Sequence, residues 1–235
     1  MIFQRNEFEV KRNISLANQA ISEIEDEVLA SFLKARCKYL LSLSYRYLNR
    51  FEEARYLAKE ALIILNLAEV GEDKAFAQYC YAIVLAEESY ISQFGRRTFE
   101  DVLSELHKSV EYAKRTEDME ILVTHSQLQL SRLYLGTTHT QLAVTYDHKR
   151  IEQSDQCLKA LKVKLENDEL DMRCQSLYFL NKCDHHRSCL ETDTAKEAAE
   201  EALELATRAS LPIEIEAARR RITCIMKLMS PCTTL

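Results

Sequence analysis

The chain has 235 residues, a formal net charge of −6, and 29% charged against 47% apolar residues. This length can bury a full hydrophobic core, and this balance of residue types excludes a disordered chain. The acidic charge argues against a general nucleic-acid binder, and the scarcity of glycine (three) and proline (two) predicts helices nearly from end to end.

The apolar periodicity predicts ten helices joined mostly by short connections. Two longer connections are expected, at 136–148 and 183–193, and neither is rich in glycine or serine as a flexible linker would be. The predicted helices span residues 6–24, 26–48, 51–69, 72–92, 98–116, 117–135, 148–166, 168–183, 194–209 and 212–229.

Some helix ends carry recognisable signals. Thr98 with Asp101 and Thr194 with Glu197 have the spacing of capping boxes. Pro212 suits the first turn of a helix, where its missing N–H is not needed.

The cysteines and the chain start bear on the cellular compartment. The eight cysteines include no C-x-x-C pair, which favours reduced thiols and a cytoplasmic or nuclear protein. The first thirteen residues lack the apolar core of a signal peptide, and no apolar run approaches the roughly 20 residues of a membrane span. We therefore expect no membrane association.

In the third predicted helix, small and apolar residues recur alternately three and four positions apart. This spacing places them on one face of the helix. Alanine at such positions predicts that another helix approaches closely. The members of this stripe are Phe51, Ala54, Ala58, Ala61, Leu65 and Ala68.

Two markers repeat along the chain. The segment LSLSY begins at Leu41, a weaker copy begins at Leu85, and LSRLY begins at Leu130, so the starts lie 44 and 45 residues apart. A period in the forties built from two helices predicts a helical solenoid. The second marker is a pair of small residues at Ala17/Ala20, Ala58/Ala61, Cys157/Ala160 and Ala199/Ala202, with His107/Val110 as the exception.

The segment 36–66 resembles a tetratricopeptide repeat, whose first helix reads Leu-small-x-x-Tyr and whose second opens aromatic-x-x-Ala. Elsewhere the match is partial, and Lys38 stands where the family has a large aromatic residue. The longer period resembles the lengthened units of kinesin light chains and Pins-like adaptors. The matching residues are Leu41, Ser42, Tyr45, Phe51, Ala54, Ala58 and Ala61.

The resemblance implies an all-α fold, a right-handed solenoid of antiparallel helix hairpins. The chain would form a single domain over residues 1–235, with a capping helix at about 6–24, repeats over about 26–209 and a second capping helix at about 212–229.

The resemblance also implies a concave groove, lined by the first helix of each pair, that holds a peptide segment of a partner protein. Arg36 and Arg46 beside Tyr39 would suit a ligand with carboxylates and apolar anchors. The alternative is that they are ordinary exposed arginines. The transferred positions are Arg36, Tyr39, Leu43 and Arg46, then Cys80, Ile83, Glu87 and Tyr90, then His125, Leu128, Arg132 and Leu135.

The segment CDHHRSC contains Cys183, His185, His186 and Cys189, which are residue types that ligate zinc. Its spacing matches no standard zinc motif, and adjacent histidines rarely reach one ion. A polar turn between helices is therefore the favoured interpretation, and we expect no resident metal or other cofactor.

No motif of a known catalytic class occurs in the chain, and three glycines leave little material for a phosphate-binding loop. We therefore expect a protein that is not an enzyme. Arg219 to Arg221 resemble a basic patch, but consecutive helical residues spread over roughly 200° and cannot form one contact surface. They are expected to decorate a terminal helix whose inner stripe is Ala218, Ile222, Ile225 and Met229.

Two functions remain open. The first is a non-catalytic adaptor that binds a peptide segment of another protein. The alternative is an RNA-binding helical-repeat protein, which requires basic residues that converge inside the groove. Arg36, Arg46 and Arg132 favour the alternative, whereas Glu87, Cys80 and Ile83 oppose it.

Overall fold

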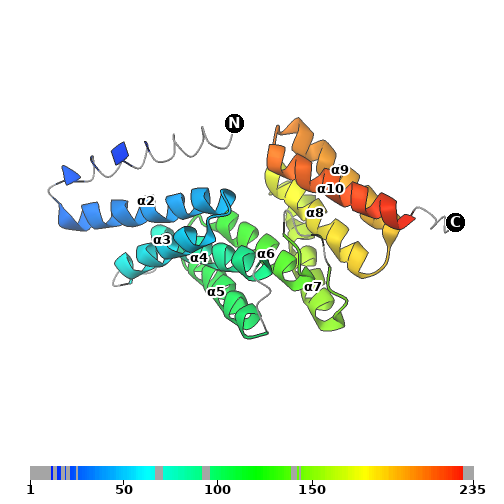
Figure 1. The fold of residues 1–235 in the computed structure, drawn as a ribbon, viewed down its shortest axis with the longest axis horizontal. Coiled ribbons are helices and arrows are strands. Elements are labelled where there is room, and N and C mark those ends of the chain that lie inside the picture. The colour runs from blue at the N-terminus through cyan, green and yellow to red at the C-terminus, as the bar shows by residue number, and fades with distance from the viewer. Residues whose placement is uncertain are drawn as a thin grey trace. The chain divides into compact units, whose positions relative to one another are not determined.

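The computed structural model describes residues 12, 15–16, 19, 22–24, 26–66, 71–91, 96–138, 142 and 144–229. Over these residues the protein is all-α, with nine helices of defined bounds and no strand, which confirms the predicted class (Figure 1). The helices are α2 (Glu27–Tyr47), α3 (Phe51–Ile64), α4 (Glu72–Ile91), α5 (Arg96–Lys114), α6 (Glu120–Leu135), α7 (His148–Glu166), α8 (Met172–Ser188), α9 (Thr192–Arg208) and α10 (Pro212–Met229). None of them combines the length and apolar composition needed to cross a membrane.

Most predicted helix bounds are confirmed within a few residues, including the start of α10 at Pro212. The prediction was wrong for α8, which continues through the expected connection at 183–193 and ends at Ser188. It was also wrong for the capping boxes, since α9 begins at Thr192 and α5 begins at Arg96, ahead of the expected caps. The predicted helix 6–24 falls largely outside the described residues.

Aspartates cap three of the helices. The Asp26 carboxylate accepts from the backbone N–H groups of Val28 and Leu29 at the start of α2. The Asp147 carboxylate likewise accepts from two backbone N–H groups at the start of α7, and that of Asp171 accepts from one, of Cys174, at the start of α8. Each cap satisfies N–H groups that have no partner within the helix, and its negative charge suits the positive end of the helix dipole.

The helices α2, α7, α8 and α9 end in one common backbone turn. In each, the residue after the C-cap has a positive φ, and the next residue donates its N–H to a carbonyl five positions back, as in the Schellman motif. Glycine usually occupies this position, but here the residues are Asn49, Asp168, Leu190 and Ser210. A chain with few glycines can thus still turn sharply after four of its helices.

Four helices carry the same buried stripe, in which successive members lie four, three and four residues apart. In α3 and its C-cap, Ala54, Ala58, Ala61 and Leu65 are at most 1% exposed, which confirms the predicted burial at these four positions. Of the other predicted members, Phe51 is half-buried and Ala68 lies outside the described residues. The small-residue marker was misplaced in α7, because Ala160 is exposed and Ser154 and Leu158 occupy the buried positions. The stripes are Ala54, Ala58, Ala61 and Leu65 in α3; Val102, Leu106, Ser109 and Ala113 in α5; Ser154, Leu158, Leu161 and Leu165 in α7; and Ala195, Ala199, Ala202 and Ala206 in α9.

The chain divides into two compact units, residues 1–126 and 127–235, and the division falls within α6. In the first unit, α2 packs on α3 and α4, and α4 packs on α3 and α5. Its core includes the stacked rings of Tyr39 and Phe76, whose centroids are 6.2 Å apart, and a cluster that joins Ala113 of α5 to Leu122 and Val123 of α6.

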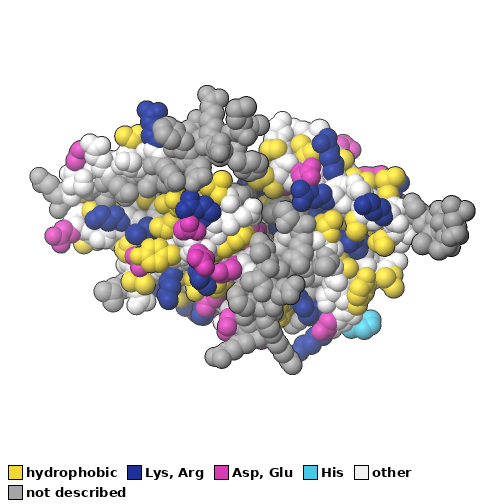
Figure 2. All heavy atoms as spheres, in the orientation of Figure 1, with side chains coloured by type: hydrophobic (Ala, Val, Ile, Leu, Met, Phe, Trp, Pro, Cys, Tyr) yellow, Lys and Arg dark blue, Asp and Glu magenta, His cyan; other side chains and the backbone are white. Residues whose placement is uncertain are grey.

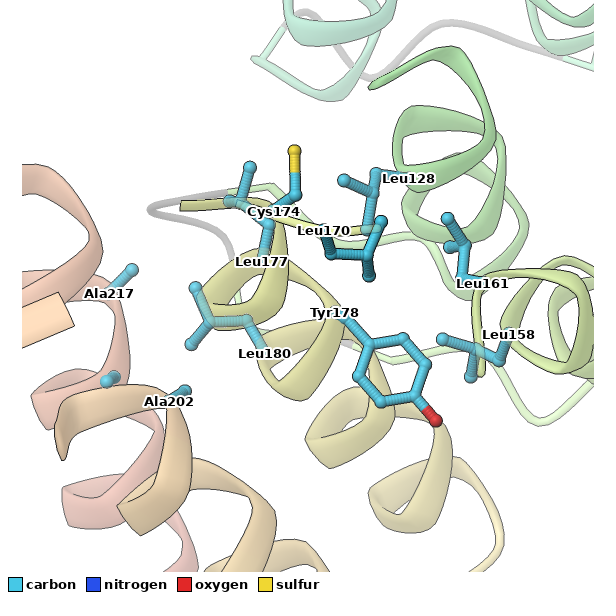
Figure 3. Close-up of a cluster of buried hydrophobic side chains, with 11 residues drawn as sticks. Leu128, Leu158, Leu161, Leu170, Cys174, Leu177, Tyr178, Leu180, Ala202 and Ala217 are labelled. Carbon is cyan, nitrogen blue, oxygen red and sulfur yellow. The ribbon is translucent and has the colours of Figure 1, made fainter. Parts of the chain in front are cut away.

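In the second unit, α8 packs on α7, α9 and α10, and α9 packs on α10. Its largest core cluster joins leucines of α6 and α7 to one side of α8 and alanines of α9 and α10 to the other (Figure 3). Tyr178 points toward Leu158 of α7, whereas Leu180 points toward Ala202 and Ala217. The small alanines allow α9 and α10 to lie close to α8.

Candidate functional site

The candidate site in the first unit begins with Asp73 at the start of α4, which receives two side chains from α2. Arg36 binds it with both ends of its guanidinium, Nε to Oδ1 at 2.8 Å and Nη2 to Oδ2 at 3.0 Å. The Tyr39 hydroxyl donates to the same Oδ1 at 2.8 Å. The hydrogen bond and charge of Asp73 raise the pKa of Arg36, and burial together with that hydrogen bond raises the pKa of Tyr39. Both side chains therefore keep their protons, and the charge of Arg36 is balanced within the protein.

Nearer its C-terminal end, α2 makes a second ion pair with α4. Arg46 donates Nη1 to Oε1 of Glu87 at 2.9 Å, and the Arg46 side chain is only 5% exposed. Next to this pair lies Cys80, whose burial raises the pKa of its thiol to about 12. Arg46 therefore fixes α4 against α2 and presents no free charge at the surface.

The predicted groove positions are thus mostly inside the protein. Within the described residues, Arg36 is the exception in α2, with 46% of its side chain exposed, and Leu43 is half-buried. His125 is half-buried, 6.4 Å from Tyr79 between ring centroids. The Tyr90 side chain falls outside the described residues. Those that are buried are Tyr39, Arg46, Cys80, Ile83, Leu128, Arg132 and Leu135.

The exposed surface of α2 is rotated by about 45° around the helix from the predicted groove positions, and Arg36 belongs to both sets. Leu29, Phe32 and Leu40 are 50%, 37% and 52% exposed, and they flank the half-exposed Arg36 on one side of the helix. We call these four residues the α2 face. Because large apolar side chains that gather on one helix face mark interaction sites more often than scattered ones do, the α2 face is the candidate site of the first unit.

The cysteine–histidine segment lies on a helix and does not form the expected turn. Cys183 is buried against Ala195 and Ile225, and burial raises the pKa of its thiol to about 12. His186 Nδ1 lies 2.6 Å from Glu191 Oε2, and Cys189 caps the helix in an exposed position. Zinc requires a deprotonated thiol, which burial of Cys183 disfavours. Among the described residues, no three His, Cys, Asp or Glu side chains are grouped to hold a metal ion.

Sequence reasoning missed a buried charge cluster in the second unit. Arg221 and Asp184 are both 0% exposed, and the guanidinium contacts both carboxylate oxygens, at 3.0 Å and 2.5 Å for the shortest contact to each. Arg187 donates to the same carboxylate at 3.0 Å. Burial alone would lower the pKa of Arg221, but the charge and hydrogen bonds of Asp184 outweigh burial and raise the pKa above its usual value. Arg221 therefore stays charged.

The arginines of this cluster also hold the connection between α6 and α7. Arg221 donates to the carbonyl of Thr138 at 3.1 Å, and Arg187 donates to that of Leu142 at 2.8 Å. The cluster therefore fixes backbone that has no helix to satisfy it, which is a structural role. The prediction that Arg221 decorates the surface was wrong. Its burial could have been inferred from its position three residues after Ala218 and four before Ile225, which places all three on the buried stripe of α10.

The cysteines and surface charges add two observations. None of the seven cysteines that the structure describes takes part in a disulfide. Figure 2 shows Asp and Glu side chains lying among the Lys and Arg side chains on the face in view, with hydrophobic side chains between them. The face in view therefore carries both signs of charge.

No protein-family model matches the chain, and no curated protein matches it.

Proposed function

We propose that this protein is a non-catalytic adaptor of the tetratricopeptide type, a right-handed solenoid of antiparallel helix hairpins that binds a segment of a partner protein in the cytoplasm or nucleus. Neighbour-to-neighbour packing of the nine described helices is compatible with such an array. The recurring buried stripe and the common helix-ending turn support a repeat of one structural unit.

The ion pairs between alternate helices also support this architecture. Arg36 contacts Asp73 and, further along α2, Arg46 contacts Glu87, so the contacts follow the same order along α2 and α4. The same order holds for α8 and α10. Helices that alternate in direction place every second helix parallel, which is the order that these contacts follow.

The observation that carries the proposed binding is the α2 face. Its three apolar side chains are about half exposed although the neighbouring side of α2 is buried against α4. An amphipathic helix of a partner would cover them, with its apolar residues on Phe32 and Leu40 and a polar group beside Arg36. The paired charges of Arg36 and Arg46 favour a protein partner over RNA, since an RNA groove needs basic side chains available for phosphates.

The test is affinity capture with the purified chain, with and without nuclease. The double variant Phe32→Glu and Leu40→Glu should lose the captured partner, because it places two charges in an apolar contact. The control is Tyr56→Glu with Ile63→Glu on α3, which places the same two charges at apolar side chains that are more exposed, 62% and 59%. Equal capture by both double variants would refute the α2 face, and capture that falls log-linearly with salt and disappears with nuclease would indicate RNA.

A further inference from the structure

A half-buried thiol of the second unit, that of Cys224 on α10, lies beside the buried charge cluster. Arg187 donates Nη2 to the Cys224 sulfur at 3.4 Å. Two guanidinium groups, those of Arg187 and Arg221, share the carboxylate of Asp184, which is the one acid paired with either of them among the described residues. The described side chains of the cluster therefore carry one positive charge in excess, next to the thiol.

The guanidinium of Arg187 has an unfilled donor on the edge that contacts Cys224. The Arg187 side chain is only 8% exposed, and its Nε has no hydrogen-bond partner within the described part of the chain. The N–H groups of Nε and Nη2 leave the same edge of a guanidinium, the edge with which Arg36 binds two oxygens of Asp73. Nη2 already contacts the Cys224 sulfur and the carbonyl of Leu142. An acceptor atom next to the sulfur would therefore satisfy Nε.

We propose that Cys224 is a site of oxidation by hydrogen peroxide, at which the sulfur gains one oxygen atom and Arg187 holds that oxygen. The sulfur attacks one peroxide oxygen, so that an S–O bond forms as the O–O bond breaks, and sulfur loses two electrons to the peroxide. The other peroxide oxygen takes up the thiol proton and leaves as water. The product is a sulfenic acid, which gives its proton to solvent. Its oxyanion accepts a charge-assisted hydrogen bond from Nε and balances the excess charge of the cluster.

The oxidised sulfur is expected to persist because the neighbouring cysteine of α8 is a poor attacking thiol. This cysteine is Cys183, one helical turn before Arg187, and it is fully buried. Burial raises the pKa of its thiol to about 12, so it stays protonated, whereas disulfide formation requires a thiolate. Oxidation of Cys224 should therefore stop at the sulfenate or continue to the sulfinate, without a disulfide to Cys183.

The first test compares three cysteines within the unmodified full chain. The folded protein receives a limiting amount of hydrogen peroxide, is unfolded in dimedone so that access to the trap is equal, and is mapped by peptide mass spectrometry. Cys189 is exposed, and burial and the charge of Glu191 raise its pKa; Cys157 is half-buried, and burial raises its pKa to about 11. Cys224 should carry about tenfold more dimedone adduct than either, because a neighbouring cation favours thiol oxidation. Adducts that are most abundant at the exposed Cys189, or a Cys183–Cys224 disulfide, would overturn the proposal.

The second test removes the guanidinium edge but keeps its charge. Arg187→Lys should lower the Cys224 adduct to the level of Cys157, because an ammonium lacks the planar pair of donors that Nε and Nη2 provide. Arg220→Lys makes the same change at an exposed arginine of α10 and should leave the adduct unchanged. Circular dichroism checks that both variants fold, and if Arg187→Lys does not, the comparison within the unmodified chain decides alone. An adduct that is unchanged in folded Arg187→Lys would show that Arg187 does not hold the oxidised sulfur.

Discussion

At the scale of single residues, the arginines differ in role although their side chains are identical. Arg220 and Arg221 are adjacent, yet Arg220 is 46% exposed in a pair with Glu216 and Arg221 is fully buried with Asp184. Helical phase alone separates them, because one residue turns the side chain by about 100°. A run of basic residues is therefore no guide to a basic surface unless the phase of the helix is known.

We expect Arg221→Met to lower the free energy of unfolding by about 3 kcal/mol, because it leaves the Asp184 carboxylate buried with one partner fewer. The loss stays near the lower limit for a broken buried pair, since Arg187 still donates to Asp184. Arg220→Met is the control and should change the stability by less than about 0.5 kcal/mol, as exposed pairs contribute little. Urea denaturation measures both variants, and similar midpoints would contradict the burial of the Asp184–Arg221 pair.

At the scale of helices, most helix positions could be predicted from the sequence, and two of the failures share one cause. The periodicity of apolar residues located the helices, because a helix with one buried face must repeat apolar residues every three or four positions. It failed where buried positions are polar: Asp184 and Ser188 lie in the last turns of α8, where CDHHRS reads as a loop, and both are buried. Ser154 hid the stripe of α7 in the same way, because its hydroxyl is paired with that of Ser131 at 2.8 Å.

The alanine stripe of α3 permits a sharp comparison between two alanines. Ala58→Leu should lower the free energy of unfolding by roughly 1–3 kcal/mol, because Ala58 is 0% exposed and three added carbons must displace close neighbours. Ala160→Leu in α7 makes the same change at an exposed position and should be nearly neutral. Thermal unfolding of the two variants distinguishes them, and equal melting temperatures would contradict close packing at Ala58.

The candidate site was less predictable than the fold. The resemblance pointed to α2 among other helices, but two of its chosen positions, Tyr39 and Arg46, are buried and bonded to side chains of α4. The carboxylate partner of Arg36, Asp73, lies 37 residues along the chain, and that of Arg46, Glu87, lies 41 residues along it. The periodicity within one helix carries no information about contacts between residues so far apart in sequence. The exposed Phe32 and Leu40 also resemble core residues in the sequence, since exposure depends on which neighbours the fold supplies.

At the scale of the whole molecule, α6 belongs to the cores of both compact units. Leu122 and Val123 join the cluster with α4 and α5, and Leu128 joins the cluster with α7 and α8. Further bonds continue this pattern, since Ser126 pairs with Ser109 at 3.1 Å and the carbonyl of Leu128 accepts from Asn181 at 2.8 Å. The single helix therefore contributes side chains to the core of each unit.

A break in α6 should accordingly weaken both units. Gln129→Pro removes one helical hydrogen bond and clashes with the carbonyl four residues earlier, at a cost of about 3 kcal/mol or more. We expect faster hydrogen exchange, measured by mass spectrometry, in peptides from α5 as well as from α7 and α8. Gln129→Ala is the control and should leave exchange unchanged. Loss of protection confined to α7 and α8 would show that the first unit is stable without the second half of α6.

The order in which the helices pack has a consequence for how fast the chain folds. Three ion pairs that join alternate helices connect residues only 37 or 41 positions apart, namely Arg36–Asp73, Arg46–Glu87 and Asp184–Arg221. Contacts between residues that are near in sequence close small loops and give rapid folding. The bond from Arg221 to the Thr138 carbonyl spans 83 residues and must wait until α7 to α10 have assembled. The connection between α6 and α7 is therefore expected to gain its native backbone late, after the helices that it joins.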